Sequence, residues 1–330
     1  MILPMLATPG THVPVGEEWV HEVKWDGVRM LGDVTRAATP AVTPAVTPAA
    51  TPAGGEHVSG EYAVRLTTRN GNDATRAWPE IAGRGPGRDV LVDGEVIALN
   101  AAGRPDFRRL AERMHIRDGR RAARLAAADP ATYLVFDLLR LDGRDVTGLG
   151  WTERRALLES LDLGSWQVPA VYDDGALLHR VTRDQGLEGT VSKRRGSLYR
   201  PGQRSRDWVK LAHRHRASYV VGGWRPQVGT QDRLAALLVG EVTAEGLAYR
   251  GRVGSGIGAK ASRMLRALLT DAAASPFVDD VPKEDAVGSH WVEPLVIVDV
   301  ETHGVGYDRL RQPAYVGVRT DIAPADLEEP

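Results

Sequence analysis

The chain has 330 residues, of which 42% are hydrophobic and 26% are charged, and its formal net charge is −1. This composition is that of a globular protein long enough for two domains, and it excludes a disordered chain, a collagen-like repeat and an apolar helix of about 20 residues that could cross a bilayer. The absence of cysteine also excludes disulfides, thiolate zinc sites and cysteine nucleophiles. No signal-peptide pattern opens the chain, so we expect a cytoplasmic protein with no membrane partner.

The basic residues are unusual in kind and in distribution. The 42 basic residues comprise 37 arginines and only five lysines, a bias that a GC-rich genome accounts for. A position that remains lysine in such a chain is a candidate for chemistry that a guanidinium cannot perform. Residues 193–216 carry nine basic side chains against one acid, and residues 108–124 carry seven against two. These stretches predict a cationic surface for a polyanion, although a solvated arginine-rich face explains the second stretch equally well.

Two strands are expected on either side of a proline-rich repeat. Residues 19–34 and 61–69 alternate in the manner of strands, and between them residues 39–53 read TPAVTPAVTPAATPA. Each proline removes a backbone donor, so the repeat should be extended or disordered. We interpret it as an insertion at 39–55 in a hairpin loop, which costs little because loop-closure entropy grows slowly with length.

The remaining elements mix strands with helices up to about residue 216, and short strands predominate after it. Strands are predicted at 89–99 and 133–141, and helices at 106–114, 152–160 (with Thr152 as its cap) and 175–185. After about residue 216, short strands are predicted at 219–224, 234–242, 247–253 and 291–301, with one helix at 259–273. This second pattern predicts a small β-barrel, with the domain boundary near 213–217.

The first chemical signal lies in EVKWDGVR, residues 22–29. Lys24 ends a strand-like segment, an acid follows two positions later, and Gly27 allows a turn. A lysine is a nucleophile only after its ammonium loses a proton, which burial and nearby cations favour. Taken alone, this short motif predicts a surface turn as readily as an active site.

Further motifs follow in order: TRNG (68–71), VDGE (92–95), VFD (135–137), EGTVSK (188–193) and WVKL (208–211). Together with KWDG, this ordered set resembles the nucleotidyltransferase motifs of ATP-dependent DNA ligases, and it is closest to the small bacterial ligases and the ligase module of bacterial end-joining proteins. Residues 291–304 and 311–321 resemble the end of the ligases' oligonucleotide-binding (OB) barrel. The resemblance implies an α+β fold, with an adenylation domain of antiparallel sheets at 1–214 and an OB-fold domain at 215–330 that ends in an acidic tail.

The resemblance also implies a reaction. Lys24 would attack the α-phosphate of ATP to form a lysine–AMP bond and release pyrophosphate; arginine could not replace it, because a guanidinium is not deprotonated in proteins. AMP would pass to the 5′-phosphate of nicked or broken double-stranded DNA, and the 3′-hydroxyl would then displace it. Each step transfers a phosphoryl group, so catalysis rests mainly on positioning and charge stabilisation.

The resemblance implies that four residues contact the nucleotide or a phosphate. It implies that Glu22 accepts from the adenine amino group and that Phe136 stacks on adenine. Arg29 and Arg69 fit the role of phosphate clamps, including the 5′-phosphate of the nick.

The resemblance further implies that Lys210 and Lys193 hold the α-phosphate, and that their charge helps to keep Lys24 deprotonated. It gives Glu95 and Glu188 the role of oxygen ligands for Mg²⁺ (or Mn²⁺), or of contacts to the ribose. As cofactors we therefore expect ATP and a divalent cation, and by analogy with the family we expect a monomer.

Two positions depart from the family's pattern. Ala212 stands where a second lysine often follows Lys210, and Ile322 stands where a lysine usually ends the final motif, in which Arg319 and Asp321 would orient pyrophosphate. These departures leave a catalytically weak, ligase-derived DNA-binding protein as one alternative. An RNA ligase or a GTP-using capping-type enzyme is another, because both share the Lys-x-Asp-Gly chemistry.

Overall fold

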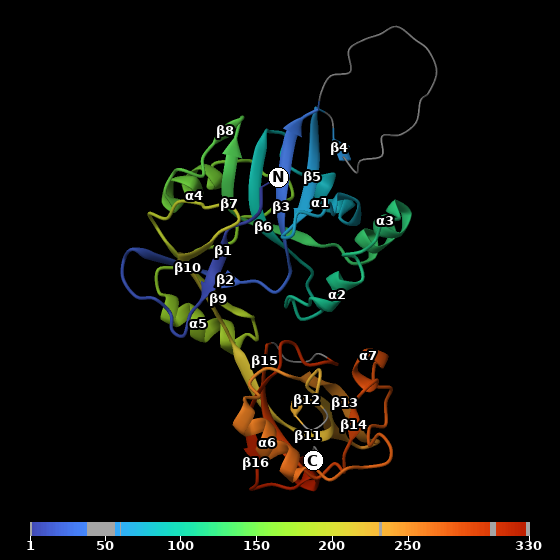
Figure 1. The fold of residues 1–330 in the computed structure, drawn as a ribbon. Coiled ribbons are helices and arrows are strands. Elements are labelled where there is room, and N and C mark those ends of the chain that lie inside the picture. The colour runs from blue at the N-terminus through green and yellow to red at the C-terminus, as the bar shows by residue number, and fades with distance from the viewer. Residues whose placement is uncertain (1, 38–56, 60, 231–232, 304–307, 328–330) are drawn as a thin grey trace. The chain divides into compact units, whose positions relative to one another are not determined.

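The computed structural model describes residues 2–37, 57–59, 61–230, 233–303 and 308–327. The chain divides into two compact units, Met1–Ala212 and His213–Pro330 (Figure 1). Both units combine β-sheets with helices, which confirms the predicted α+β class. The predicted proline-rich insertion at 39–55 lies outside the described residues. None of the described helices is both long and apolar enough to cross a membrane.

The first unit contains two sheets. The four-stranded sheet has the spatial order β1 (Leu6–Pro9), β10 (Arg204–Ala212), β9 (Gly189–Arg194) and β2 (Trp19–Lys24). The six-stranded sheet has the order β4 (His57–Ser59), β5 (Tyr62–Thr68), β3 (Val28–Arg36), β6 (Val90–Ile97), β7 (Thr132–Leu141) and β8 (Arg144–Asp145). All pairs are antiparallel except β1 with β10. The two strands predicted on either side of the repeat pair directly as β3 and β5, but the short strand β4 lies between them in the chain and pairs with the other edge of β5.

Short helices accompany these sheets. They are η1 (Thr75–Ala77), α1 (Pro79–Ala82), α2 (Arg108–Ala111), α3 (Gly119–Ala128), α4 (Trp151–Glu159) and α5 (Gly175–Asp184). The helix predicted at 106–114 is shorter at both ends and covers only Arg108–Ala111; the Asp106 carboxylate accepts from the Arg108 amide at its start. The prediction that Thr152 caps α4 is wrong. Gly150 precedes the helix and its amide donates to the Glu153 carboxylate, whereas the Thr152 hydroxyl donates to the Arg195 carbonyl.

Two apolar clusters lie on the two faces of the six-stranded sheet. The larger one contains Trp78, Tyr133, Leu138 and Leu158 and forms the main core. The smaller one joins this sheet to the four-stranded sheet. Its buried members are Met5, Leu31, Leu91, Leu139, Tyr199 and Trp208. Truncating a fully buried tryptophan such as Trp208 typically costs about 3–5 kcal/mol, so this small cluster holds the two sheets in a fixed relation.

The second unit contains one sheet. Its order is β13 (Gly246–Val253), β12 (Leu234–Thr243), β11 (Arg214–Pro226), β15 (Ile297–His303) and β16 (Ala314–Arg319), with β14 (His290–Trp291) also on β11. Its helices are α6 (Ala259–Leu268), α7 (Lys283–Ala286) and η2 (Pro324–Leu327). Over the described residues the sheet does not close into a barrel: beyond β13, a single bridge joins Ser255 to Ala314 of the edge strand β16.

Two elements of this unit end at other residues than the sequence predicts. The strand predicted at 291–301 is split into β14 and β15, because Pro294 lies between them and has no amide to donate. The helix predicted at 259–273 ends at Leu268, since Asp271 forms a β-bridge with Val292 instead.

Candidate active site

The four-stranded sheet brings the predicted cations onto one face. Side chains two residues apart on a strand share a face, so Glu22 and Lys24 of β2 point the same way. Across β2, β9 and β10, Glu22 is paired with Val191, and Val191 is paired with Lys210, so these three residues share a face. On the same face, Val20 of β2 is paired with Lys193 of β9. The sheet therefore presents Glu22, Lys24, Lys193, Trp208 and Lys210 on a single face.

Lys24 forms an ion pair with Glu188, and their side chains are only 21% and 18% exposed. The residue opposite Lys24 on β9 is Gly189, which is left-handed at φ +144°. A Cβ atom there would lie 2.2 Å from the Leu211 carbonyl oxygen, so only glycine permits this approach of β9 and β10. The EG of EGTVSK thus supplies both the carboxylate partner of Lys24 and the space beside it.

Glu22 and Lys193 form a buried ion pair at the floor of the site. Lys193 Nζ lies 2.8 Å from Glu22 Oε2, 4.5 Å from the centroid of the Phe136 ring and 4.4 Å from that of Trp208. Burial raises the pKa of Glu22 and lowers that of Lys193, while each charge partly offsets the shift of the other. Glu22 Oε1 is buried and no described residue donates a hydrogen bond to it.

Lys210 lies among other cations. Burial lowers the pKa of Lys210, and Lys24, Arg204 and Arg69 lower it further, while Glu188 opposes them. Arg69 is exposed, on a turn closed by a 2.8 Å hydrogen bond from the Gly71 amide to the Thr68 carbonyl. This concentration of positive charge suits a polyphosphate.

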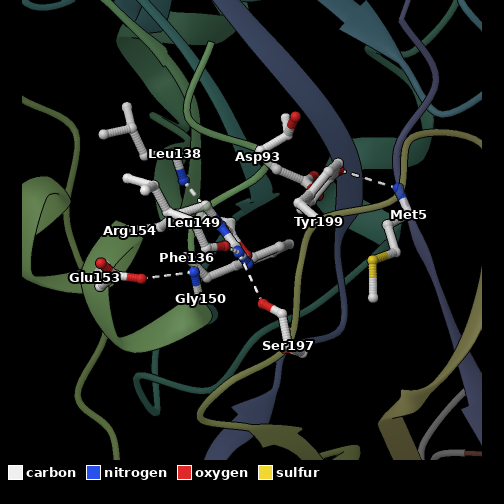
Figure 2. A network of polar contacts seen from close by, with 12 residues as sticks. Met5, Asp93, Phe136, Leu138, Leu149, Gly150, Glu153, Arg154, Ser197 and Tyr199 are labelled. Atoms are coloured by element: carbon white, nitrogen blue, oxygen red, sulfur yellow. Dashed lines mark hydrogen bonds and ion pairs between the residues drawn. The ribbon is translucent and has the colours of Figure 1, made fainter.

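The six-stranded sheet contributes Arg29, whose guanidinium donates two hydrogen bonds, of 3.0 and 2.6 Å, to the Asp93 carboxylate. Asp93 is fully buried and also accepts from the Tyr199 hydroxyl at 2.6 Å, while the Tyr199 oxygen accepts from the Met5 amide at 3.0 Å (Figure 2). Burial opposes the charge on Arg29, but the Asp93 carboxylate outweighs it and holds the pKa of Arg29 above its usual range. The arginine is therefore fixed in place and permanently charged.

Glu95 pairs with Arg29 across β3 and β6. Burial raises the pKa of Glu95 to about 8; Lys24 and Arg29 oppose this shift, while Glu188 and Asp93 add to it. The KWDG turn lies directly against this strand, since a Cβ on Gly27 would approach the Val96 carbonyl oxygen to 2.3 Å. Glu95 is therefore held within the electrostatic influence of both Lys24 and Glu188.

The described residues contain no cluster of three or more acidic, histidine or cysteine side chains that could hold a metal ion. Burial is the main cause of the raised pKa of Glu95, and the charge of Glu188 adds to it; a divalent cation would relieve the repulsion between the two carboxylates. Magnesium commonly uses only one or two carboxylates together with substrate phosphates. The two glutamates therefore fit such an ion.

Phe136 reaches the site because β7 is irregular. The β6–β7 register shifts between Asp93 and Gly94, whose partners are Asp137 and Val135, so Phe136 has no partner across the ladder. The following Asp137 is held by Arg154 through hydrogen bonds of 2.7 and 2.9 Å. Arg154 also donates to the carbonyls of Leu149 and Ser197 (Figure 2), so the backbone on the C-terminal side of Phe136 is firmly anchored.

Arg319 and Asp321 belong to the second unit. They are joined by two 2.7 Å hydrogen bonds, and these bonds lower the pKa of Asp321 to about 2. Arg319 also donates to Ser218 and lies 3.6 Å from Asp299. Ile322, which stands in place of the family's lysine, packs against an apolar cluster that includes Phe277 and Ile297.

Nine of the predicted residues thus belong to the first unit, on β2, β3, β6, β7, β9, β10 and two adjoining turns. Sequence analysis assigned no role to Asp93, Tyr199, Trp208 or Arg154, which hold the predicted residues in place. The Asp93-Gly94-Glu95 motif was visible, but nothing in the sequence paired Asp93 with Tyr199, which lies 106 positions away.

A lysine at a strand end, surrounded by carboxylates and further cations between a mixed four-stranded sheet and an antiparallel six-stranded sheet, is the arrangement of a nucleotidyltransferase-type unit, and the second unit is of the OB type although its sheet does not close over the described residues. Residues 57–211 match the family "ATP dependent DNA ligase domain", and residues 230–322 match "ATP dependent DNA ligase C terminal region". A solved structure of mycobacterial DNA ligase D complexed with ATP and MES is 31% identical, with a TM-score of 0.53, over 99% of this chain and 97% of that one. The chain belongs to the ATP-dependent DNA ligase family.

Longer relatives match as well. The multifunctional non-homologous end joining DNA repair protein LigD of Mycobacterium tuberculosis (strain ATCC 25618 / H37Rv) is 34% identical over 99% of this chain, and LigD of Pseudomonas aeruginosa is 32% identical over 97%. The chain spans only 39% and 36% of the lengths of these two proteins.

Proposed function

We propose that this chain seals nicked or broken duplex DNA through a covalent lysine–AMP intermediate, with the first unit as the adenylation domain and the second as an OB-type DNA-binding domain. The observation that carries the proposal is the placement of Lys24. It ends β2 beside Glu188, on one face with Glu22 and Lys210, and it lies close enough to Glu95 to influence its charge.

In the first step, Lys24 Nζ attacks the α-phosphorus of ATP; the N–P bond forms as the bond to the β-phosphate oxygen breaks, and pyrophosphate leaves. The ion pair with Glu188 must open and Nζ must lose a proton before attack. The cations around Lys210 would stabilise the phosphate charge as it develops during transfer.

Adenine recognition is assigned to the buried carboxylate of Glu22 and the ring of Phe136. The free Glu22 Oε1 is a buried acceptor, which suits the adenine amino group, and Phe136 offers a ring for stacking. We revise the role of Lys193: its ammonium is committed to Glu22, so it positions that carboxylate, and Lys210 with Arg69 takes the phosphates. Arg29 would contact the 5′-phosphate of the DNA end while Asp93 holds it.

Glu95 and Glu188 would hold Mg²⁺ or Mn²⁺ together with phosphate oxygens, and the bound ion would neutralise phosphate charge during transfer. Arg319 and Asp321 would orient the pyrophosphate, as the family's final motif implies. Residue 322 is an apolar packing residue here, so this role must rest on those two side chains. We also propose that the protein acts as a cytoplasmic monomer, which sedimentation at several concentrations tests.

The central test is self-adenylylation. Wild-type protein incubated with Mg²⁺ and α-labelled ATP should carry label that survives denaturing electrophoresis, and Lys24→Ala should carry none. An unlabelled wild type would refute the enzyme, and a labelled Lys24→Ala would refute the nucleophile. Labelling by GTP in place of ATP would indicate capping chemistry, and preference for nicked RNA over nicked DNA would indicate an RNA ligase; membership of the DNA ligase family favours neither outcome.

A further inference from the structure

The structure separates the seven arginines of residues 108–124 into two groups. Three are used within the fold: Arg108 pairs with Asp106, Arg109 with Asp129, and the buried Arg113 with Glu80. The other four are exposed, and none forms an ion pair with another described residue. These four are Arg117, Arg120, Arg121 and Arg124, which we call the α3 arginines.

The α3 arginines gather on one side of their helix. Arg120 and Arg121 lie four and three residues before Arg124, so both neighbour it on one side of the helix, and Arg117 lies just before the N-cap Asp118. The opposite face is apolar: Ala122 is fully buried, and α3 packs against α1 and η1. In Figure 1, α3 lies at the outer edge of the first unit.

This arrangement is unfavourable for the helix by itself. Arg120 and Arg121 lie in the first turn, where the helix dipole disfavours positive charge, and no acidic residue lies in that turn. Arg120 and Arg124 are like charges at i and i+4, which also repel. Of the nearby exposed acids, Asp118 already accepts a 2.9 Å hydrogen bond from the Arg120 amide as the N-cap. The four guanidinium groups are therefore exposed to solvent and are accessible to a partner outside the chain.

We infer that the α3 arginines are a second contact surface for the phosphate backbone of duplex DNA, separate from the residues around Lys24. This inference rests on the proposed function, because it takes DNA as the substrate. Guanidinium groups suit phosphates through paired hydrogen bonds, and four exposed cations on a chain of net charge −1 provide a local positive field. The contact reads no base sequence, so it should strengthen binding to any duplex and add to its salt dependence.

The test compares a fourfold Arg→Gln variant at the α3 arginines with a fourfold Arg→Lys variant at the same positions. Glutamine and lysine have similar helix propensities, so the two variants differ chiefly in charge. Binding is measured by fluorescence anisotropy on a nicked duplex that lacks the 3′-hydroxyl, between about 50 and 200 mM salt. We expect the Gln variant to bind at least about tenfold more weakly at low salt. The slope of log K against log[salt] should fall in magnitude by about 3.6, at about 0.9 for each of the four lost contacts. The Lys variant should keep most of the slope.

Self-adenylylation, which needs no DNA, should be unchanged in both variants. Equal affinity and slope for the wild type and the Gln variant would overturn the α3 surface; so would an equal loss in the Lys variant, which would indicate a structural role. A wild type that forms no AMP adduct would overturn the proposed function instead, while the binding measurement, which needs no turnover, would still decide the DNA contact.

Discussion

The two sheets of the first unit hold their charges in different ways. On the six-stranded sheet two fully buried carboxylates are saturated: Asp93 accepts from Arg29 and Tyr199, and Asp137 accepts twice from Arg154. On the four-stranded sheet, by contrast, Glu22 keeps a buried oxygen without a donor, and Lys24 and Lys210 lie near one another.

This difference separates scaffold from binding surface. A saturated polar network rigidifies the groups it contains, whereas an unpaired buried acceptor and crowded cations are unfavourable until a ligand satisfies them. The six-stranded sheet therefore holds Arg29 and Phe136 in position before the nucleotide binds. The polar groups of the four-stranded sheet gain their favourable contacts only when the nucleotide binds. Five experiments can test this contrast, in order of decreasing effect.

The largest effect is expected from Lys24→Arg. This change keeps the positive charge and the ion pair with Glu188, but a guanidinium is not deprotonated in proteins, so AMP adduct formation should fall to background. Intact-mass spectrometry after incubation with ATP and Mg²⁺ measures the adduct. Adduct formation within tenfold of the wild type would contradict the assignment of Lys24.

Removing the hydrogen-bond donor of a buried carboxylate on the six-stranded sheet should lower the free energy of unfolding. Arg154→Met leaves Asp137 buried without its cation and should lower the free energy of unfolding by about 3–5 kcal/mol. Urea unfolding measures this. The double variant Arg154→Met with Asp137→Leu removes both charges and should recover much of the loss; if it does not, the pair is not the source of the stability.

Glu22→Gln should affect recognition more than folding. With its amide oxygen towards Lys193, the glutamine would turn its NH₂ group towards the adenine amino group, so the KM for ATP in self-adenylylation should rise roughly 5- to 100-fold, the equivalent of about 1–3 kcal/mol. The matched control is purine riboside triphosphate, which lacks the amino group. The wild type should prefer ATP to this analogue and the variant should not; an unchanged preference would place adenine elsewhere.

Glu95 should make stability depend on pH. Its pKa is about 8 in the folded protein and about 4.5 when unfolded, so the folded state binds the extra proton. The stabilising contribution of the protonated Glu95 side chain to the free energy of unfolding is fully present below pH 4.5 and is lost as the pH rises through about 8. Without divalent cations, Glu95→Gln should gain about 1–3 kcal/mol relative to the wild type between pH 5 and 9, allowing for solvent screening. A pH-independent difference between their melting temperatures would exclude this.

The smallest effect is expected from the proline-rich repeat. Strands β3 and β5 already pair on either side of it, from Arg36 with Tyr62 onwards. Replacing residues 39–53 by a short Gly-Ser turn should therefore change the rate of nick sealing less than about twofold, because loop-closure entropy varies slowly with length. A large loss of sealing would give the repeat a function.

The sequence by itself indicated the family, and it predicted most of the strands. Three of the five lysines (Lys24, Lys193 and Lys210) fall in the six ordered motifs that indicated the family. Alternation predicted β3 and β5, and apolar runs predicted β6 and β7, because local patterns indicate which faces of a strand are buried. Its errors lay at element ends, such as the α4 cap, where one hydrogen bond from the Gly150 amide decides the outcome.

Only the tertiary structure decided which charges pair. Lys193 and Lys210 look alike in the sequence, yet the register of β2, β9 and β10 buries one against Glu22 and leaves the other beside Lys24. The arginines of residues 108–124 were equally ambiguous until their partners Asp106, Asp129 and Glu80 were located. Ion pairing depends on distances between residues far apart in the chain, and only the folded backbone sets those distances.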